Sequence, residues 1–440
     1  MEEVTDEPLY RDRVCGIDIG KAELYATIRV PSEKDPARRA SETRSFATTR
    51  RGVLALADWL RCWQVPAVVM EATGDYWKGP FYRLEAEGLD CVLADAKQVR
   101  HLPGRPKRDS SDSSWLAACF ERGSVRPCFV ATPEFRIIRL HTRYRRDLTE
   151  ERSREKQRAE KLLESAAIKL SSVVTDLHGV TGRDIMNHLI AGERNPRALA
   201  QLARARARRK ITELEHALEG AEFFTADLAA LLKAMLDRID RVNAEIARLT
   251  EVIETLLAPH EEQLQQAESM PGWGRRSAED ALAETGPDMT RFPTGAHLAS
   301  WAGRTPLDNQ SGKRTGRSKH KKGNRYLGAI TGETAVSAGK TATREGARYR
   351  KIARSRGKAK ACVAVGNTQM RVYHKLLSNP GTRYDDLGPD YYERQAATRR
   401  KIAYHVREIQ AEGFEVTLCR PVPQPEPGPG QDSPPGSQAA

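Results

Sequence analysis

Nine apolar residues near the middle of the chain recur at alternating steps of four and three, and this heptad seam is the strongest constraint on the fold. A repeat that lasts four heptads predicts one long helix whose apolar stripe packs on another helix. The partner is either a second copy of the chain, in a coiled coil, or a helix of the same chain, and we expect the seam to mediate contact between protomers. The seam comprises Leu228, Leu232, Met235, Ile239, Val242, Ile246, Leu249, Ile253 and Leu256.

The candidate partner within the chain is the charged helical stretch 134–170. Four of its apolar residues fall on one stripe at helical spacing: Ile137, Leu140, Tyr144 and Leu148. We therefore expect this stripe to be the packed face of the helix. The glycines and prolines of 171–200 predict only short helices before the seam.

The N-terminal part of the chain has a different pattern. Apolar runs at 14–19, 24–30, 67–70 and 91–94 predict strands, and helical patterns lie between them. Strands and helices that alternate after an initial hairpin indicate an α/β domain with a mixed sheet covered by helices.

The C-terminal part begins after Pro259 and is expected to be mostly α-helical. The stretch MPGWGRRSAEDALAETG resembles a helix-hairpin-helix, whose PGWG turn would present backbone N–H groups to a phosphate. Beyond Arg420 the tail is rich in Pro, Gly and Ser and is predicted to be disordered. The expected segments are an acidic tail (1–12), an α/β domain (13–131), a helical coiled-coil region (132–260), a C-terminal domain (261–385), a helical extension (386–419) and the tail (420–440).

Positive charge is concentrated in one segment. The net charge is +13, yet residues 301–360 hold 17 Lys/Arg and 3 Asp/Glu, which gives +14 there and −1 elsewhere. A solvated basic surface would disperse its charge, so this pattern favours a polyanionic partner, most simply nucleic acid.

Composition also indicates the cellular compartment of the protein. No apolar run approaches the length of a membrane span, and the first residues are acidic and polar, unlike a signal peptide. The seven cysteines form no CxxC pair, which is typical of reduced thiols in a cytosolic protein. We therefore expect a cytoplasmic protein.

One aspartate interrupts an apolar strand. Asp18 lies within GIDIG, and an ionised carboxylate there costs several kcal/mol unless it is paired. Glu71 ends another apolar run, and Asp109 and Asp112 are three residues apart at an expected helix start. Taken singly, the last three could be solvated acids. Together, the four would need cations, and Mg²⁺ is the usual choice beside phosphates.

These motifs, taken in order, resemble those of a known family. GIDIGK, MEATGDYW and KRDSSD, followed by PGWG, GRTP, QSGKRTG and KKGNRYL, resemble the motifs of the Piv/MooV-like insertion-sequence transposases over about residues 13–380. The resemblance implies an RNase H-like (RuvC-like) N-terminal domain with a DEDD carboxylate set that holds two Mg²⁺ ions: Asp18, Glu71, Asp109 and Asp112.

The resemblance also assigns a nucleophile. Ser311 aligns with the serine that attacks DNA to form a covalent phosphoserine, although a Ser-Gly pair by itself usually marks only a turn. In the family the carboxylate site faces the serine of another protomer, dimers pair into a tetramer, and a structured guide RNA pairs with donor and target DNA. Such an enzyme would act at the bacterial nucleoid. The expected nucleic-acid contacts are Lys107, Lys313, Arg314, Arg317, Lys319, Lys321, Lys322 and Arg325.

Other interpretations remain open at this point. Trp301 and Tyr326 could stack on bases or pack in the core. GIDIG also resembles the phosphate hairpin of actin-like kinases, but these need a second related domain and a Gly-rich adenosine motif. A Holliday-junction-resolvase-like nuclease would lack the serine domain. An inactive RNA- or DNA-binding derivative would not need the acids or Ser311 intact.

Overall fold

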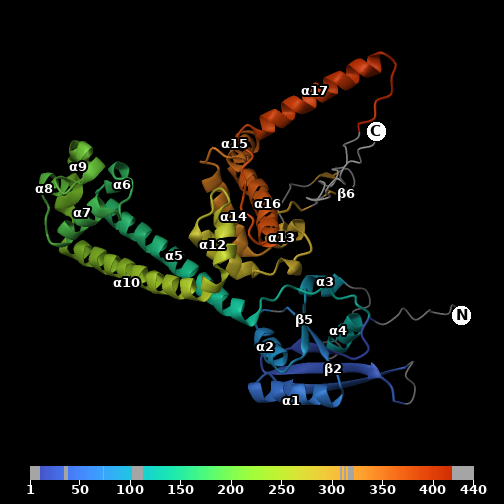
Figure 1. Cartoon of the computed structure of the whole chain (residues 1–440). Coiled ribbons are helices and arrows are strands. Elements are labelled where there is room, and N and C mark those ends of the chain that lie inside the picture. The colour runs from blue at the N-terminus through green and yellow to red at the C-terminus, as the bar shows by residue number, and fades with distance from the viewer. Residues whose placement is uncertain are drawn as a thin grey trace, which may run out of the picture. The chain divides into compact units, whose positions relative to one another are not determined.

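The computed structural model describes residues 10–33, 38–72, 74–101, 112–307, 310–311, 314–315 and 322–418. The chain divides into two compact units, Met1–Arg136 and Ile137–Ala440, coloured blue to teal and teal to red in Figure 1. Within the described ranges, no helix is long and apolar enough to cross a membrane. The six cysteines described there form no disulfide.

The first unit is built on a five-stranded mixed sheet with the order β3-β2-β1-β4-β5. The first three strands form antiparallel pairs, whereas β4 is parallel to β1 and β5 is parallel to β4. This is the RNase H-type arrangement expected from the sequence, so the α/β prediction is confirmed. The strands are β1 (Val14–Ile19), β2 (Glu23–Pro31), β3 (Arg39–Ala47), β4 (Ala67–Glu71) and β5 (Asp90–Ala94).

Helices cover both faces of this sheet. Alternate residues of β1 and β4 belong to two separate cores, because successive side chains of a strand point to opposite faces. Ile17 and Met70 pack with α1, and Val14 and Val69 pack with α4. The helices of the unit are α1 (Arg50–Cys62), α2 (Lys78–Ala86), α3 (Ala96–His101) and α4 (Asp112–Glu121).

In the second unit, two long helices lie side by side (Figure 1): α5 (Pro133–Ser165), which begins in the first unit, and α10 (Ala226–Leu257). Leu148 of α5 packs on Val242 and Ile246 of α10, and Arg152 donates a 3.0 Å hydrogen bond to Asn243. All nine seam residues are buried or half-buried within the single chain. Within the single chain the seam therefore packs on α5, which is the internal alternative, while its contact between protomers stays a prediction.

The face of α5 that packs differs from the predicted one. Leu148 is buried as expected, but Ile137, Leu140 and Tyr144 are 52%, 67% and 48% exposed. Thr142 and Arg145 are buried instead, because this turn of α5 packs through ion pairs with α12 rather than through apolar contacts. Three of the four residues of the stripe therefore lie outside the packed face of α5.

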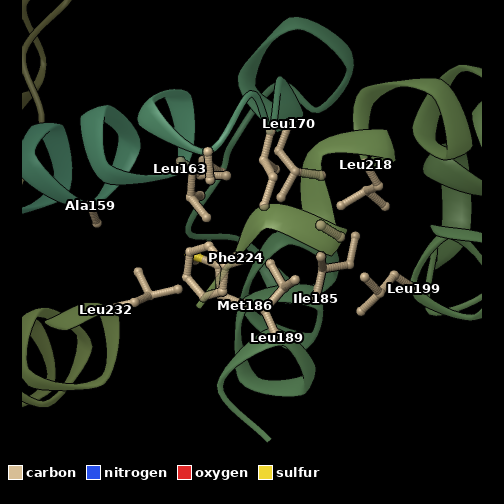
Figure 2. Packing of buried hydrophobic residues seen from close by; sticks show 14 of the residues in the cluster. Ala159, Leu163, Leu170, Ile185, Met186, Leu189, Leu199, Leu218, Phe224 and Leu232 are labelled. Carbon is tan, nitrogen blue, oxygen red and sulfur yellow. The ribbon is translucent and has the colours of Figure 1, made fainter. Parts of the chain in front are cut away.

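Short helices close the far end of the α5–α10 pair around an apolar core (Figure 2). Five side chains of that cluster are each at most 1% exposed: Leu163, Met186, Leu218, Phe224 and Leu232. Short helices were expected in this region, and this core makes the end of the hairpin a folded subdomain. They are α6 (Leu170–Val173), α7 (Val180–Ile190), α8 (Pro196–Ala200), η2 (Ala205–Lys210), α9 (Ile211–Ala217) and η3 (Glu219–Phe223).

The remaining helices, apart from α17, which has no buried residue, form a bundle that contains the PGWG turn. The two helices that flank this turn pack on each other, as the helix-hairpin-helix prediction expects. The turn also packs on α14, since a Cβ at Gly272 would lie 2.4 Å from Thr334 O. The elements are η4 (Ala258–His260), α11 (Glu261–Glu268), α12 (Arg275–Thr285), η5 (Met289–Arg291), α13 (Gly295–Trp301), β6 (Gln310–Ser311), β7 (Arg314–Thr315), α14 (Arg325–Ala338), α15 (Arg344–Arg356), α16 (Lys358–Leu377) and α17 (Tyr391–Ala411).

Candidate active site

Asp18 and Glu71 lie at matching positions on neighbouring parallel strands. The register of β1 and β4 ends with Ile17 opposite Met70, so the next residue on each strand is one of these two acids. Both acids are half-buried. Because residues at matching positions of parallel strands share a face, both carboxyl groups belong to the face that carries Gly16 and Val69.

Helix α4 covers that same face and runs antiparallel to β1. Its last residue, Glu121, accepts a 2.9 Å hydrogen bond from Arg29, whose strand partner is Val14 at the start of β1. Glu121 is 1% exposed and also pairs with Arg39 at 2.5 Å. The C-terminal end of α4 is thus fixed beside the beginning of β1.

The first turn of α4 is fixed near the other end of β1. Ser113 and Thr27 share a 2.7 Å hydrogen bond between their hydroxyl oxygens, and Thr27 is the strand partner of Gly16. Gly16 permits this close approach, because a Cβ there would lie 2.2 Å from Ser113 O. Asp112, the first residue of α4, therefore lies toward the end of β1 that carries Asp18.

Three of the four predicted acids therefore converge on one end of the sheet, and carboxylates are suitable ligands for a hard divalent cation. The fourth, Asp109, and the predicted contact Lys107 lie outside the described residues. Among the described residues, no three His, Cys, Asp or Glu side chains lie close enough to hold a metal ion. Asp18, Glu71 and Asp112 each have interactions with other residues.

The segment that carries Ser311 leaves and rejoins the bundle at one point. Asn324 N donates a 2.9 Å hydrogen bond to Trp301 O, which ties the KKGN motif to the end of α13. Gly323 makes this possible, because a Cβ there would lie 2.3 Å from Gly303 N. The side chain of Asn367 in α16 donates a 3.0 Å hydrogen bond to Arg304 O. Both ends of the serine segment are thus anchored on rigid helices.

Within that segment, Ser311 lies in β6 and is the backbone partner of Arg314 in β7. Of the other predicted nucleic-acid contacts, Lys322 and Arg325 are exposed. The remaining four lie outside the described residues: Lys313, Arg317, Lys319 and Lys321.

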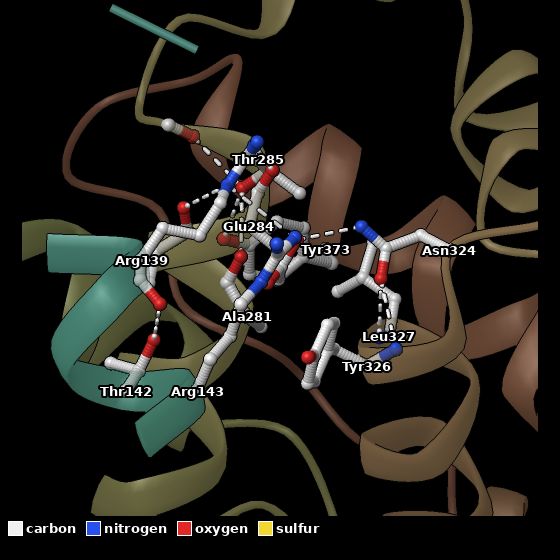
Figure 3. Close-up of polar contacts among 12 residues, drawn as sticks. Arg139, Thr142, Arg143, Ala281, Glu284, Thr285, Asn324, Tyr326, Leu327 and Tyr373 are labelled. Atoms are coloured by element: carbon white, nitrogen blue, oxygen red, sulfur yellow. Dashed lines mark hydrogen bonds and ion pairs between the residues drawn. The ribbon is translucent and has the colours of Figure 1, made fainter. Parts of the chain in front are cut away.

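A charge network that no sequence motif predicts lies beside this anchor (Figure 3). Glu284 of α12 is 1% exposed and accepts hydrogen bonds of 2.7 and 2.9 Å from Arg143 of α5. It also accepts a 2.6 Å bond from Asn324, and Arg139 lies 3.5 Å away. Burial by itself would lower the pKa of Arg143. The hydrogen bonds to Glu284 and its negative charge together outweigh burial, so the pKa of Arg143 is raised above its ordinary value. No motif in the sequence marks Glu284, which follows the apolar residues Ala281, Leu282 and Ala283 in α12.

The two aromatic residues that could stack on bases make internal contacts. The ring of Trp301 lies 5.3 Å from that of Phe292. The guanidinium carbons of Arg143 and Arg325 lie 4.3 and 4.6 Å from the ring centre of Tyr326. These contacts support a packing role for both rings.

Comparison with known proteins places both halves of this arrangement in one family. An IS110-type DEDD transposase model, described as a transposase, matches residues 15–168. A second model, described as "Transposase IS116/IS110/IS902 family", matches residues 264–350. No curated protein matches the chain.

Among solved structures, the first unit is similar to RuvC of Thermus thermophilus. One such structure shares 14% identity, covers 26% of this chain and 99% of its own, and has a TM-score of 0.21. A second, T. thermophilus RuvC in complex with a Holliday junction substrate, shares 13% identity, covers 27% and 100%, and has a TM-score of 0.20.

The two transposase models together match more than half of the 440 residues, and they include the strand acids and the PGWG, GRTP and KKGN motifs. The predicted resemblance is thereby confirmed. Transposases of the DEDD type generally depend on a divalent metal. The chain belongs to the IS116/IS110/IS902 family of insertion-sequence transposases, and its activity is that of a DNA transposase.

Proposed function

We propose that the chain cuts and rejoins DNA by means of a carboxylate-bound pair of Mg²⁺ ions and a serine nucleophile. The observation that carries this proposal is the convergence of Asp18, Glu71 and the first turn of α4 on one end of the sheet. Asp109 completes the set by its place in KRDSSD. When bound, the two ions would stabilise negative charge on the attacking and leaving oxygens.

Ser311 is the proposed nucleophile. Its hydroxyl oxygen forms a bond to phosphorus, the bond from phosphorus to one sugar oxygen breaks, and that oxygen gains a proton while the serine loses one. The resulting phosphoserine conserves the energy of the cleaved bond for rejoining to a second DNA end. The anchored ends of the segment and the Lys/Arg residues that follow Ser311 in QSGKRTG support this role, since cations stabilise the charge of a phosphate.

A structured guide RNA is the proposed source of sequence specificity. A segment with a charge of +14 favours binding to the backbones of nucleic acids, whatever their sequence. Base pairing between the RNA and DNA would then read the sequence, while the protein holds backbone and shape.

The test is a search for a covalent adduct. Purified protein is incubated with element-end DNA, guide RNA and Mg²⁺, then denatured, and the adduct is mapped by proteolysis. We expect it on the peptide that contains Ser311, and we expect Ser311→Ala to abolish it while nucleic-acid binding persists. Ser318→Ala, in the same segment, is the matched control. Cleavage without an adduct would instead indicate a hydrolytic nuclease, and binding without cleavage an inactive derivative.

A further inference from the structure

A cavity of about 550 Å³ opens on the second unit between α5, α12 and α14. Its volume lies in the range of sites that hold a small ligand or one nucleotide. Its lining is strongly charged and includes Arg145, Arg146, Arg154 and Arg276. The proposed carboxylate and serine sites do not use any of these four arginines.

Two of the arginines are paired with acids. Arg145 is 2% exposed and contacts Glu279 at 2.7 Å and Asp280 at 2.6 Å. These two acids lie on one turn of α12, so Arg145 joins α5 to α12 as a structural ion pair.

Arg146 is paired in the same way with the remaining acids of the cavity. Its Nη2 lies 3.0 Å from Glu333 of α14, and its Nε lies 3.5 Å from Glu150 of α5. All three carboxylates of the lining are therefore engaged: Glu150, Asp280 and Glu333.

Arg154 and Arg276 differ from the first two. Both are exposed, and the side chain of neither forms a hydrogen bond or an ion pair with the described residues. Partial burial lowers the pKa of Arg276 and the positive charge of Arg145 lowers it further, while Asp280 and Glu279 oppose the shift in part. Because neither guanidinium is engaged with an acid of the described chain, both can form charge-assisted hydrogen bonds to an anion in the cavity.

The start of α12 adds further donors on the same side. Arg276 and Ser277 are the second and third residues of the helix, and both line the cavity. Gly274 precedes the helix and provides no side-chain cap for the first N–H groups.

We infer that this cavity binds a backbone phosphate of a nucleic acid through Arg154, Arg276 and Ser277. Arg forms paired hydrogen bonds to phosphate oxygens, and the hydroxyl of Ser277 is a further donor. The inference rests on the proposed function only in that the chain must bind nucleic acid. It adds a binding site outside the serine segment, on the face of α5 and α12.

The test compares Arg276→Gln and Arg154→Gln with Arg208→Gln in the full chain. Arg208 is exposed on η2, at the other end of the α5–α10 pair, and its substitution removes the same charge. Single-stranded DNA and RNA of one sequence are titrated over a range of salt concentrations. We expect each cavity variant to weaken binding about fivefold and to reduce the slope of log Kd against log salt by about 0.7–0.9. Arg208→Gln should change neither.

The two nucleic acids identify the source of the phosphate: a loss only with RNA assigns the site to the guide, a loss only with DNA to the substrate, and a loss with both to a shared contact. Equal slopes for cavity and control variants would overturn the site. So would a fall in the melting temperature of Arg276→Gln, because that would make Arg276 a structural residue. Since binding is measured without cleavage, the result is independent of whether Ser311 forms an adduct.

Discussion

Asn324 donates a 2.6 Å hydrogen bond to Glu284, and this contact ties the end of the serine segment to a buried ion pair. The same side chain caps α14, because its oxygen accepts hydrogen bonds from the N–H groups of Tyr326 and Leu327 at 2.9 and 3.1 Å. One residue thus fixes the start of α14, the return of the segment and the position of α12.

The first prediction concerns Glu284→Gln. Removing the charge leaves Arg139 and Arg143 facing a neutral side chain in a buried site, which costs about 3–5 kcal/mol. Urea unfolding monitored by circular dichroism should show this loss. Glu333→Gln is the matched control, because Glu333 is 65% exposed and its pair with Arg146 is worth at most about 1 kcal/mol. Equal losses in both variants would contradict the network.

The second prediction concerns Asp18→Asn. The change removes a proposed metal ligand but keeps the shape of the side chain, so the fold and nucleic-acid binding should persist. The rate of strand cleavage in Mg²⁺ should fall by more than about 100-fold. Mutating a residue that only hydrogen-bonds to a metal ligand already lowers activity by up to about that factor. Asp75→Asn is the control, because Asp75 is 83% exposed and its ion pair in the described structure is with Lys78 at the surface. Normal cleavage by Asp18→Asn would show that the site is misassigned.

The third prediction concerns the approach of α4 to the sheet. In Gly16→Ala the new methyl would overlap Ser113 O and Ala117 N, which are backbone atoms and cannot simply move aside. We expect a loss of about 1–3 kcal/mol in the free energy of unfolding, and reduced cleavage because the helix that begins at Asp112 must shift. Gly79→Ala is the control, since its methyl would meet no atom within 4 Å. Unchanged cleavage in a stable Gly16→Ala protein would separate the position of α4 from catalysis.

The sheet could be predicted because its central strands are apolar on both faces. The runs at 14–19 and 67–70 reappear as β1 and β4, whereas β3 was missed because it is a largely exposed edge strand with the polar sequence RASETRSFA. The four acids could be found because motifs mark them, but the carboxylate at Glu284 could not. Its partners Arg143 and Asn324 are 141 and 40 residues away in the chain.

The packing partner of α10 could not be predicted from the sequence. Its heptad spacing predicted the helix and its apolar face, but spacing alone does not say whether the partner belongs to the same chain. Long charged helices such as α5 carry little apolar signal, because here the contacts include ion pairs such as Arg238 with Glu151 at 2.5 Å. Within one chain the seam packs on α5, whereas the surface that joins protomers in the dimers and tetramers implied by the family resemblance stays a prediction.

The fourth prediction tests that assignment. Ile239 is 2% exposed within the chain, so Ile239→Asp should destabilise the α5–α10 pair by several kcal/mol. Leu231→Asp on the same helix is the control, because Leu231 is 52% exposed and should change stability little. Thermal unfolding and light scattering are measured together. If Ile239→Asp had a lower mass by light scattering but an unchanged melting temperature, the seam would be an interface between protomers.

The last prediction concerns Glu345, a buried acid in the first turn of α15. It is 2% exposed, and neither of its carboxylate oxygens has a hydrogen-bond partner in the described structure. The nearest cation is Arg344, with Nη2 3.6 Å from Oε1, which exceeds hydrogen-bond distance. Burial therefore raises the pKa of the Glu345 carboxyl, and Arg344 opposes the shift only in part.

The sign of the pH dependence follows from this shift. Because the folded state binds the proton of Glu345 more tightly than the unfolded state, its contribution to stability is complete below the ordinary glutamate pKa of about 4.3. That contribution is lost as the pH rises through the higher pKa of the folded state. Glu345→Gln should therefore raise the free energy of unfolding by about 1–3 kcal/mol at pH 7, and much less near pH 4. Urea unfolding at both pH values measures this difference, with the exposed Glu254→Gln as control. A stabilisation that is equal at both pH values would mean that the carboxyl is not buried in its charged form.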